Sequence, residues 1–115
     1  MTSDCIFCRI ISGAIPASFV YQDEHVVAFP DVHPQAPTHV LIVPRQHVAS
    51  LSELADPELA GRLLLAVGEV ARRGGVAERG FRTIINTGAE GGQTVPHLHL
   101  HLLAGSKFAE GSLGE

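Results

Sequence analysis

The sequence has little positive charge and no long hydrophobic run. Lysine and arginine number 8 against 12 aspartate and glutamate residues, which gives a net charge of -4 and a pI near 5.9. DNA and RNA polymers are bound by neutralising many phosphates, so this balance argues against a nucleic-acid-binding protein. No segment approaches the roughly 20 apolar residues that a transmembrane helix needs, and no membrane partner is expected.

The chain also has few cysteines and no visible targeting segment. A basic stretch is missing from residues 1–4, and Arg9 interrupts the short apolar run that follows, so a secretory signal is not expected. We therefore expect a cytoplasmic location, where Cys5 and Cys8 stay reduced. Repeats, linkers and low-complexity tracts are not visible, which predicts a single domain over residues 1–115.

Two helices are predicted from apolar spacing and capping residues. Residues 5–11 have the spacing of one or two helical turns, closed by Ser12-Gly13. An aspartate followed by a proline, Asp56-Pro57, starts one long helix, and Gly74-Gly75 ends it. The apolar stripe of this helix consists of Leu59, Ala60, Leu63, Leu64, Val67, Val70 and Ala71.

Five short strands complete the predicted fold. They cover residues 18–21, 25–29, 38–43, 81–86 and 98–103, and turn residues bound them. Residues 22–24 join the first two as a hairpin, and the apolar run 40–43 is typical of a central strand. The short connections favour an α+β domain: a five-stranded, mainly antiparallel sheet with one long helix and a short N-terminal helix.

The segment HLHLHLL at residues 97–103 alternates histidine and leucine. Side chains alternate between the two faces of a strand, so the three imidazoles share one face and the leucines anchor the other in a core. Leucine or threonine would fill these positions at a lower desolvation cost, so packing alone does not explain three histidines. One zinc ion held by all three would require a strongly bent strand, because residues i and i+4 lie about 13 Å apart.

Separate roles for the three imidazoles at a phosphate group fit this pattern better than one shared zinc ion. A neutral imidazole attacks phosphorus, and a protonated neighbour stabilises the charge on the phosphoryl oxygens. The preceding Gly91-Gly92 lets the backbone approach a ligand closely, and Gln93 and Thr94 add a carboxamide and a hydroxyl. By itself, a glycine pair of this kind indicates only a turn.

Together these motifs strongly resemble the histidine-triad (HIT) superfamily, whose signature is His-x-His-x-His followed by two apolar positions. The resemblance extends through PQAPTH at residues 34–39, VPRQH at 43–47 and NTG at 86–88, and spans residues 5–105. It is closest to the Hint branch, the nucleoside phosphoramidate hydrolases. The resemblance implies a homodimeric, HIT-like α+β fold that binds an AMP-like purine nucleotide. It further implies hydrolysis of a P–N bond at the α-phosphate through a nucleotidyl-histidine intermediate, as in an adenosine 5′-monophosphoramidase, without a catalytic cofactor.

The resemblance also implies roles for individual residues. His99 corresponds to the nucleophile and His101 to a phosphate contact, while His39 joins the cluster and helps to fix the ring states. Thr94 stands where the family usually has serine. Its hydroxyl is expected to hydrogen-bond the phosphate or the leaving group, and its additional methyl group to narrow the site. The remaining nucleotide-binding positions are Asn86, Gly92 and Gln93 on the phosphate side, Asp31 at the ribose, Ile6, Phe7, Ile10, Phe29 and Val32 around the base, and Val95. Without the family, Asp31 would be interpreted as a solvated loop residue and the apolar residues as ordinary core.

The cysteine pair has the C-x2-C spacing of half a zinc site. Because a second cysteine pair is missing, histidines would have to complete a Cys2His2 set. A resemblance to some bacterial HIT proteins implies a structural zinc ion on Cys5, Cys8, His47 and His97. Two buried free thiols are the alternative, and the motif alone supports them nearly as well.

Other functions stay open at this point. One is a dinucleoside polyphosphate hydrolase or nucleotidyl transferase of the same superfamily. Another is a nucleotide-binding regulatory module without turnover, and a more distant option is a metal-dependent hydrolase. The segment from Gly105 onward lacks the tryptophan found in the aromatic tail of better-known Hint proteins, so the preferred leaving group is also open.

Overall fold

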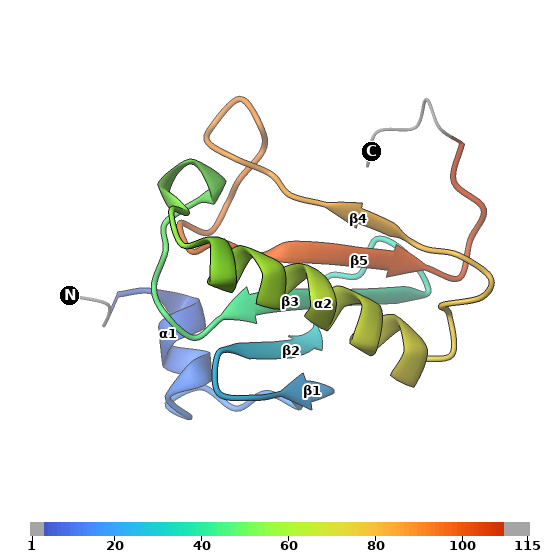
Figure 1. Cartoon of the computed structure of the whole chain (residues 1–115), viewed down its shortest axis with the longest axis horizontal. Helices are drawn as coiled ribbons and strands as arrows, with labels where there is room; N and C mark the ends of the chain where they lie inside the picture. The colour runs from blue at the N-terminus through green and yellow to red at the C-terminus, as the bar shows by residue number, and fades with distance from the viewer. Residues whose placement is uncertain (1–3, 110–115) are drawn as a thin grey trace.

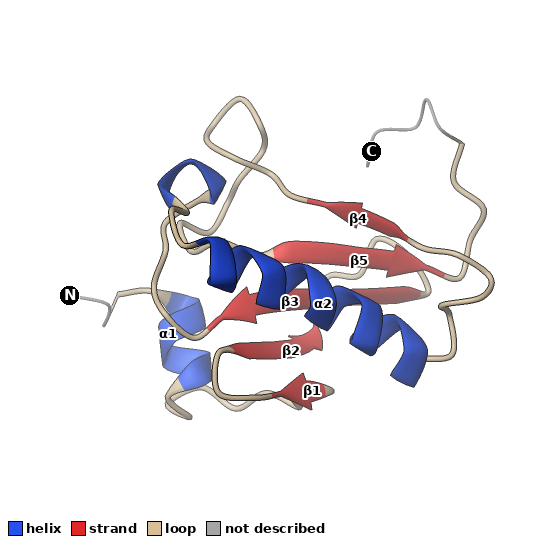
Figure 2. Ribbon diagram, in the orientation of Figure 1, coloured by secondary structure: helices blue, strands red, loops and turns tan. Residues whose placement is uncertain are grey.

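The computed structural model describes residues 4–109. Its elements are α1 (Ile6–Ile11), β1 (Tyr21–Gln22), β2 (Val26–Pro30), β3 (Thr38–Pro44), the 3-10 helix η1 (Leu51–Glu53), α2 (Pro57–Arg73), β4 (Arg82–Ile84) and β5 (Leu100–Ala104). Each neighbouring pair of strands is antiparallel, in the order β1-β2-β3-β5-β4. The predicted α+β class with a five-stranded antiparallel sheet is confirmed (Figures 1 and 2). Within the described range, no helix is long and apolar enough to cross a membrane.

Both faces of the sheet are covered. Val40 and Ile42 of β3 belong to the core under α2, whereas Leu41 and Val43 pack with residues of α1 on the opposite face. Figure 1 shows α2 lying across its face of the sheet. Burial on both sides explains the continuous apolar run of β3, which forms the middle of the sheet as predicted.

The long helix begins and ends where its caps predict. The Asp56 carboxylate accepts the backbone N–H of Glu58 at 3.0 Å, and Gly74 forms the C-cap. Of the predicted stripe, the buried members are Leu59, Leu63, Val67, Val70 and Ala71. The prediction is wrong for Leu64, which is 61% exposed. Each helical residue is turned by about 100° from the one before, which carries Leu64 off the packed face next to Leu63.

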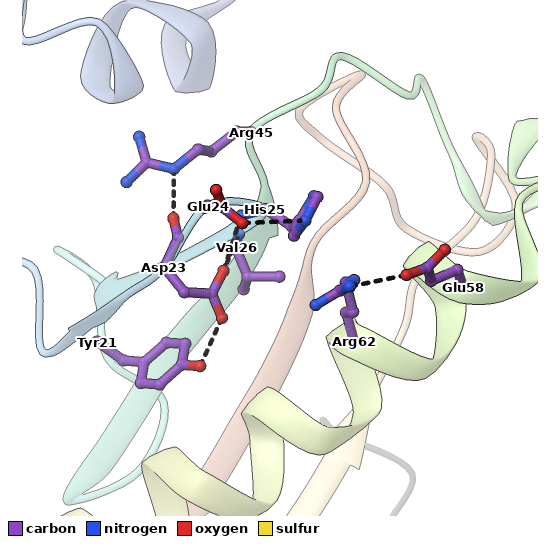
Figure 3. Close-up of polar contacts among 8 residues, drawn as sticks. All are labelled: Tyr21, Asp23, Glu24, His25, Val26, Arg45, Glu58 and Arg62. Atoms are coloured by element: carbon purple, nitrogen blue, oxygen red, sulfur yellow. Dashed lines mark hydrogen bonds and ion pairs between the residues drawn. The ribbon is translucent and has the colours of Figure 1, made fainter.

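The predicted hairpin at residues 22–24 forms around one carboxylate. Asp23 accepts the backbone N–H groups of His25 and Val26, both at 2.8 Å, and the hydroxyl of Tyr21 also donates to it (Figure 3). The strand predicted over residues 18–21 is reduced to Tyr21–Gln22. The bonds to Asp23 place the turn immediately after β1.

The histidine-rich strand starts later than predicted. Pairing begins at Leu100, because Pro44 on the neighbouring strand has no N–H to extend the ladder. Instead, the carbonyl of Pro44 accepts the Nε2–H of His97 at 2.9 Å, and the Leu98 N–H donates to the carbonyl of Val48 at 2.7 Å. The predicted alternation nevertheless holds, and the residues in the core under α2 are Leu98, Leu100 and Leu102.

Candidate active site

A cavity of about 520 Å³ lies on the α1 side of the sheet. Its volume is in the range of small-molecule sites, and most of its walls are apolar. The nucleotide-binding and catalytic residues predicted from the sequence that line it are Ile6, Phe7, Ile10, Phe29, Asp31, Val32, Thr94, Val95, His99 and His101. Residues from α1, β2, the loop after β2 and the segment before β5 therefore meet in one place.

His99 lines this cavity, and one of its ring nitrogens is hydrogen bonded to the backbone. Its Nδ1 lies 2.7 Å from the carbonyl oxygen of His97. A carbonyl can only accept, so Nδ1 carries the proton and the Nε2 of the neutral ring keeps its lone pair. Phe7 packs edge-on against the ring, with the centroids 5.1 Å apart and the planes at 90°. The ring is thus held in place with a nucleophilic nitrogen available for a ligand.

His101 is the second imidazole of the cavity, and it contacts His39 behind it. Its Nδ1 lies 2.9 Å from the Nε2 of His39, and its ring centroid is 5.0 Å from that of His99. Burial, with the neighbouring His99 and His39, lowers the pKa of His101 to about 4 against the opposing effect of Asp31. Burial likewise lowers the pKa of His39. At neutral pH the His101 ring is therefore neutral.

Asp31 connects the histidine cluster with the cavity wall. Its Oδ2 lies 3.4 Å from the Nε2 of His39, and its Oδ1 accepts the backbone N–H of His33 at 2.9 Å. The side chain is half-buried and lines the cavity. It is therefore in position to accept a hydrogen bond from a bound ligand.

The loop before the histidines is held together by its own polar side chains. The amide of Gln93 donates to the carbonyls of Ala49 and Val95, at 2.8 and 2.9 Å, and its Oε1 accepts the Gly88 N–H at 2.9 Å. The Asn86 amide donates to the carbonyl of Gly91 at 2.8 Å. These contacts shape the loop that delivers Thr94 and Val95 to the cavity. The residues predicted on the phosphate side that are not among its lining residues are Asn86, Gly92 and Gln93, so their contact with a phosphate stays a prediction.

Part of the cavity wall was not predicted from the sequence. The additional lining residues are Ile15, Pro16, Ala17, Ser18, Pro30, His33 and Leu41. Residues 15–18 are irregular, so no periodicity marks them. They reach the cavity because the chain reverses after α1, which is a property of the tertiary structure.

The two cysteines lie beside the two histidines predicted with them. The ligand atoms of Cys5, Cys8, His47 and His97 all lie within 4.8 Å of one another. The Nδ1 of His97 is 3.2 Å from Cys5 Sγ and 3.6 Å from Cys8 Sγ, and the Nδ1 of His47 is 3.4 Å from Cys8 Sγ. Tetrahedral zinc separates a sulfur and a nitrogen ligand by about 3.6 Å. The proton on Nε2 of His97 also leaves its Nδ1 lone pair directed at the thiols, so the set fits zinc.

Comparison with known proteins gives consistent matches over nearly the whole chain. The family model of the HIT domain matches residues 12–108. The purine nucleoside phosphoramidase of Escherichia coli is 45% identical over 107 residues, which are 91% of this chain and 90% of that protein. An uncharacterized HIT-like protein of Synechococcus elongatus is 50% identical over 111 residues, covering 95% and 96% of the two chains. The crystal structure of a HIT family hydrolase from Legionella pneumophila has a TM-score of 0.91 at 40% identity, covering 95% of this chain and 99% of that one.

Proposed function

Because this chain belongs to the HIT domain family, we propose that it is a hydrolase that cleaves the P–N bond of purine nucleoside 5′-phosphoramidates at the α-phosphate. The observation that carries the proposal is the His99 ring, whose Nδ1 is tied to a backbone carbonyl while the ring lines a nucleotide-sized cavity. The name of the Escherichia coli relative supports the substrate class.

The reaction proceeds by two displacements at phosphorus. In the first, His99 Nε2 bonds to the α-phosphorus while the P–N bond of the substrate breaks, and the leaving nitrogen takes up a proton and departs as an amine. In the second, a water oxygen bonds to phosphorus and the bond to His99 breaks. The water proton is released, the nucleoside monophosphate leaves, and the ring is restored. Hydrogen bonds from His101 and Thr94 stabilise the charge on the phosphoryl oxygens in both steps.

The rest of the cavity holds the nucleoside. The Asp31 carboxylate accepts hydrogen bonds from the ribose hydroxyls, and the apolar side chains of α1 and β2 contact the base. Burial of flat aromatic and aliphatic surface favours a purine ring, because contact area with an apolar wall increases with ring size.

Replacement of His99 tests the proposed nucleophile. We expect His99→Asn to reduce turnover of an adenosine phosphoramidate by roughly 10⁴-fold or more, while AMP binding measured by calorimetry changes much less. His25→Asn removes a histidine that is not among the cavity-lining residues and serves as the matched control. Wild-type turnover by His99→Asn would rule out this nucleophile.

Substrate comparison separates the proposal from the other functions of this fold. We expect faster turnover of an adenosine phosphoramidate than of a diadenosine polyphosphate. The opposite preference would overturn the assignment of the P–N bond. AMP binding without turnover of either substrate would indicate a nucleotide-binding module instead.

We further propose that Cys5, Cys8, His47 and His97 hold a structural zinc ion. Zinc bound there would join the start of α1 to the segment before β5. The ion would leave His99 and His101 free for the phosphate.

A further inference from the structure

His39, which does not line the cavity, accepts a backbone hydrogen bond. The N–H of Gln35 donates to the Nδ1 of His39 at 2.9 Å. A backbone amide nitrogen can only donate, so this Nδ1 carries a lone pair. A neutral imidazole has one N–H, and the proton of His39 is therefore on Nε2.

The proton position of His39 also determines that of His101. The Nε2–H of His39 points to the Nδ1 of His101, 2.9 Å away, so that nitrogen must accept. The Oδ2 of Asp31 is also near this Nε2, at 3.4 Å, and a carboxylate likewise requires a donor there. Both contacts thus demand the same tautomer of His39. With its Nδ1 accepting, neutral His101 carries its proton on Nε2.

From these contacts we infer that the Gln35 backbone N–H is a positioning group: acting through His39, it fixes the His101 proton on Nε2, where it donates to the substrate phosphate. The phosphate contact rests on the proposed function, whereas the proton positions rest only on the hydrogen bonds. His99 and His101 then stand in opposite tautomers, with ring centroids 5.0 Å apart. One ring supplies a lone pair to phosphorus and the other supplies an N–H to a phosphoryl oxygen.

The surroundings keep this arrangement neutral and fixed. His39 is 6% exposed, and burial lowers its pKa. The titratable groups facing His101 are His39, His99 and Asp31, and burial with the two histidines lowers the pKa of His101 to about 4 against the opposing carboxylate. Near pH 7 each of these two rings therefore has a single proton whose position the hydrogen bonds decide.

The loop that carries the amide is braced by its own contacts. The side chain of Gln35 donates to the carbonyl of His33 at 3.1 Å, and the N–H of His33 donates to Asp31 at 2.9 Å. Prolines lie on both sides, at Pro34 and Pro37. Position 35 must supply a backbone N–H, which a third proline could not do.

Nitrogen NMR of the histidine rings tests the proton positions directly. In ligand-free, isotopically labelled protein near pH 7, we expect the Nε2–H tautomer for His39 and His101 and the Nδ1–H tautomer for His99. Addition of AMP should shift the Nε2–H resonance of His101. A His101 proton on Nδ1 would overturn the inference. Because no turnover is involved, failure of the proposed reaction would not affect this result.

A pair of variants at one position tests the role of the amide. Gln35→Pro removes the N–H, whereas Gln35→Ala keeps it and serves as the reference. We expect kcat of Gln35→Pro to be roughly 10-fold to 100-fold below that of Gln35→Ala, with a smaller change in KM and a mixed tautomer at His101. Equal kcat and an unchanged His101 tautomer in the folded proline variant would contradict the inference. If the proline variant does not fold, the wild-type NMR spectrum still decides the matter.

Discussion

At the scale of single residues, the chemistry of this site depends on backbone groups that direct the histidine protons. The carbonyl of His97 fixes the proton of His99 on Nδ1. The N–H of Gln35 donates to the Nδ1 of His39 and so fixes the proton of that ring on Nε2. Two rings of the same residue type thereby acquire different tasks. Replacing one imidazole is therefore expected to change the proton position of the ring that is hydrogen bonded to it.

The buried His101 ring predicts a loss of stability in acid. Its pKa is about 4 in the folded chain against an ordinary value of 6.5, so between these values the unfolded chain binds a proton that the folded chain does not. The free energy of unfolding therefore falls as the pH drops from 6.5 toward 4. We expect the decrease between pH 7 and pH 5, measured by urea unfolding, to be smaller by about 2 kcal/mol in His101→Gln. An equal decrease in the variant and the wild type, compared in the same metal state, would show that His101 does not contribute.

The sequence predicts which residues meet but not how their protons are arranged. Alternation in HLHLHLL correctly places leucines in the core under α2 and directs His99 and His101 to the other face, where they line the cavity. The tautomers depend on Gln35 and on a backbone carbonyl, and hydrogen bonds of this kind leave no periodic signal. The cavity residues 15–18 were missed for a related reason, because an irregular segment is placed by tertiary contacts.

At the scale of elements, α1 links the cysteine cluster to the candidate active site. Cys5 caps the helix and Cys8 lies in its first turn. Between them Phe7 packs against both His97 and His99, with centroid distances of 5.8 and 5.1 Å. A metal that holds the two thiols would therefore also hold the ring that packs on the nucleophile.

Removal of zinc is predicted to destabilise the protein through this helix. We expect one zinc ion per chain by elemental analysis, and a melting temperature that falls on strong chelation and recovers with added zinc. The double variant Cys5→Ser, Cys8→Ser should retain no zinc and should not respond to the chelator. Wild-type protein without zinc and with unchanged melting would instead support two reduced thiols that hold no metal.

Element boundaries were harder to predict than element types. The start of α2 follows from Asp56-Pro57, where the cap and the proline act locally. The start of β5 depends on Pro44, which lies far away in sequence and cannot donate to the ladder. The start of the helix can therefore be predicted from neighbouring residues, whereas the start of the strand depends on its partner strand.

At the scale of the whole molecule, one face of α2 is left apolar and exposed. Leu64 and Leu65 are 61% and 75% exposed, although the helix buries its other face on the sheet. Strand β4 forms one edge of the sheet and pairs only with β5 among the described strands. An exposed apolar helix face and an unpaired sheet edge are each typical of an interface between protein chains.

These features support the proposal that the protein is a homodimer. We expect light scattering after size-exclusion chromatography to give twice the mass of the chain. Leu65→Glu places a charge on this helix face and should give monomers. Val20→Glu introduces the same charge at an exposed apolar residue beside the opposite edge strand, and should leave the dimer intact. A monomeric wild-type protein would contradict the proposal.

The central claim is that His99 bonds to phosphorus before water does, and the stereochemical course at phosphorus tests it most directly. A phosphorothioate analogue of the phosphoramidate, with one configuration at phosphorus, would be hydrolysed in isotopically labelled water. Each in-line displacement inverts the configuration, so attack by His99 followed by water gives net retention. Net inversion would mean that water attacks the substrate directly, and it would contradict the account.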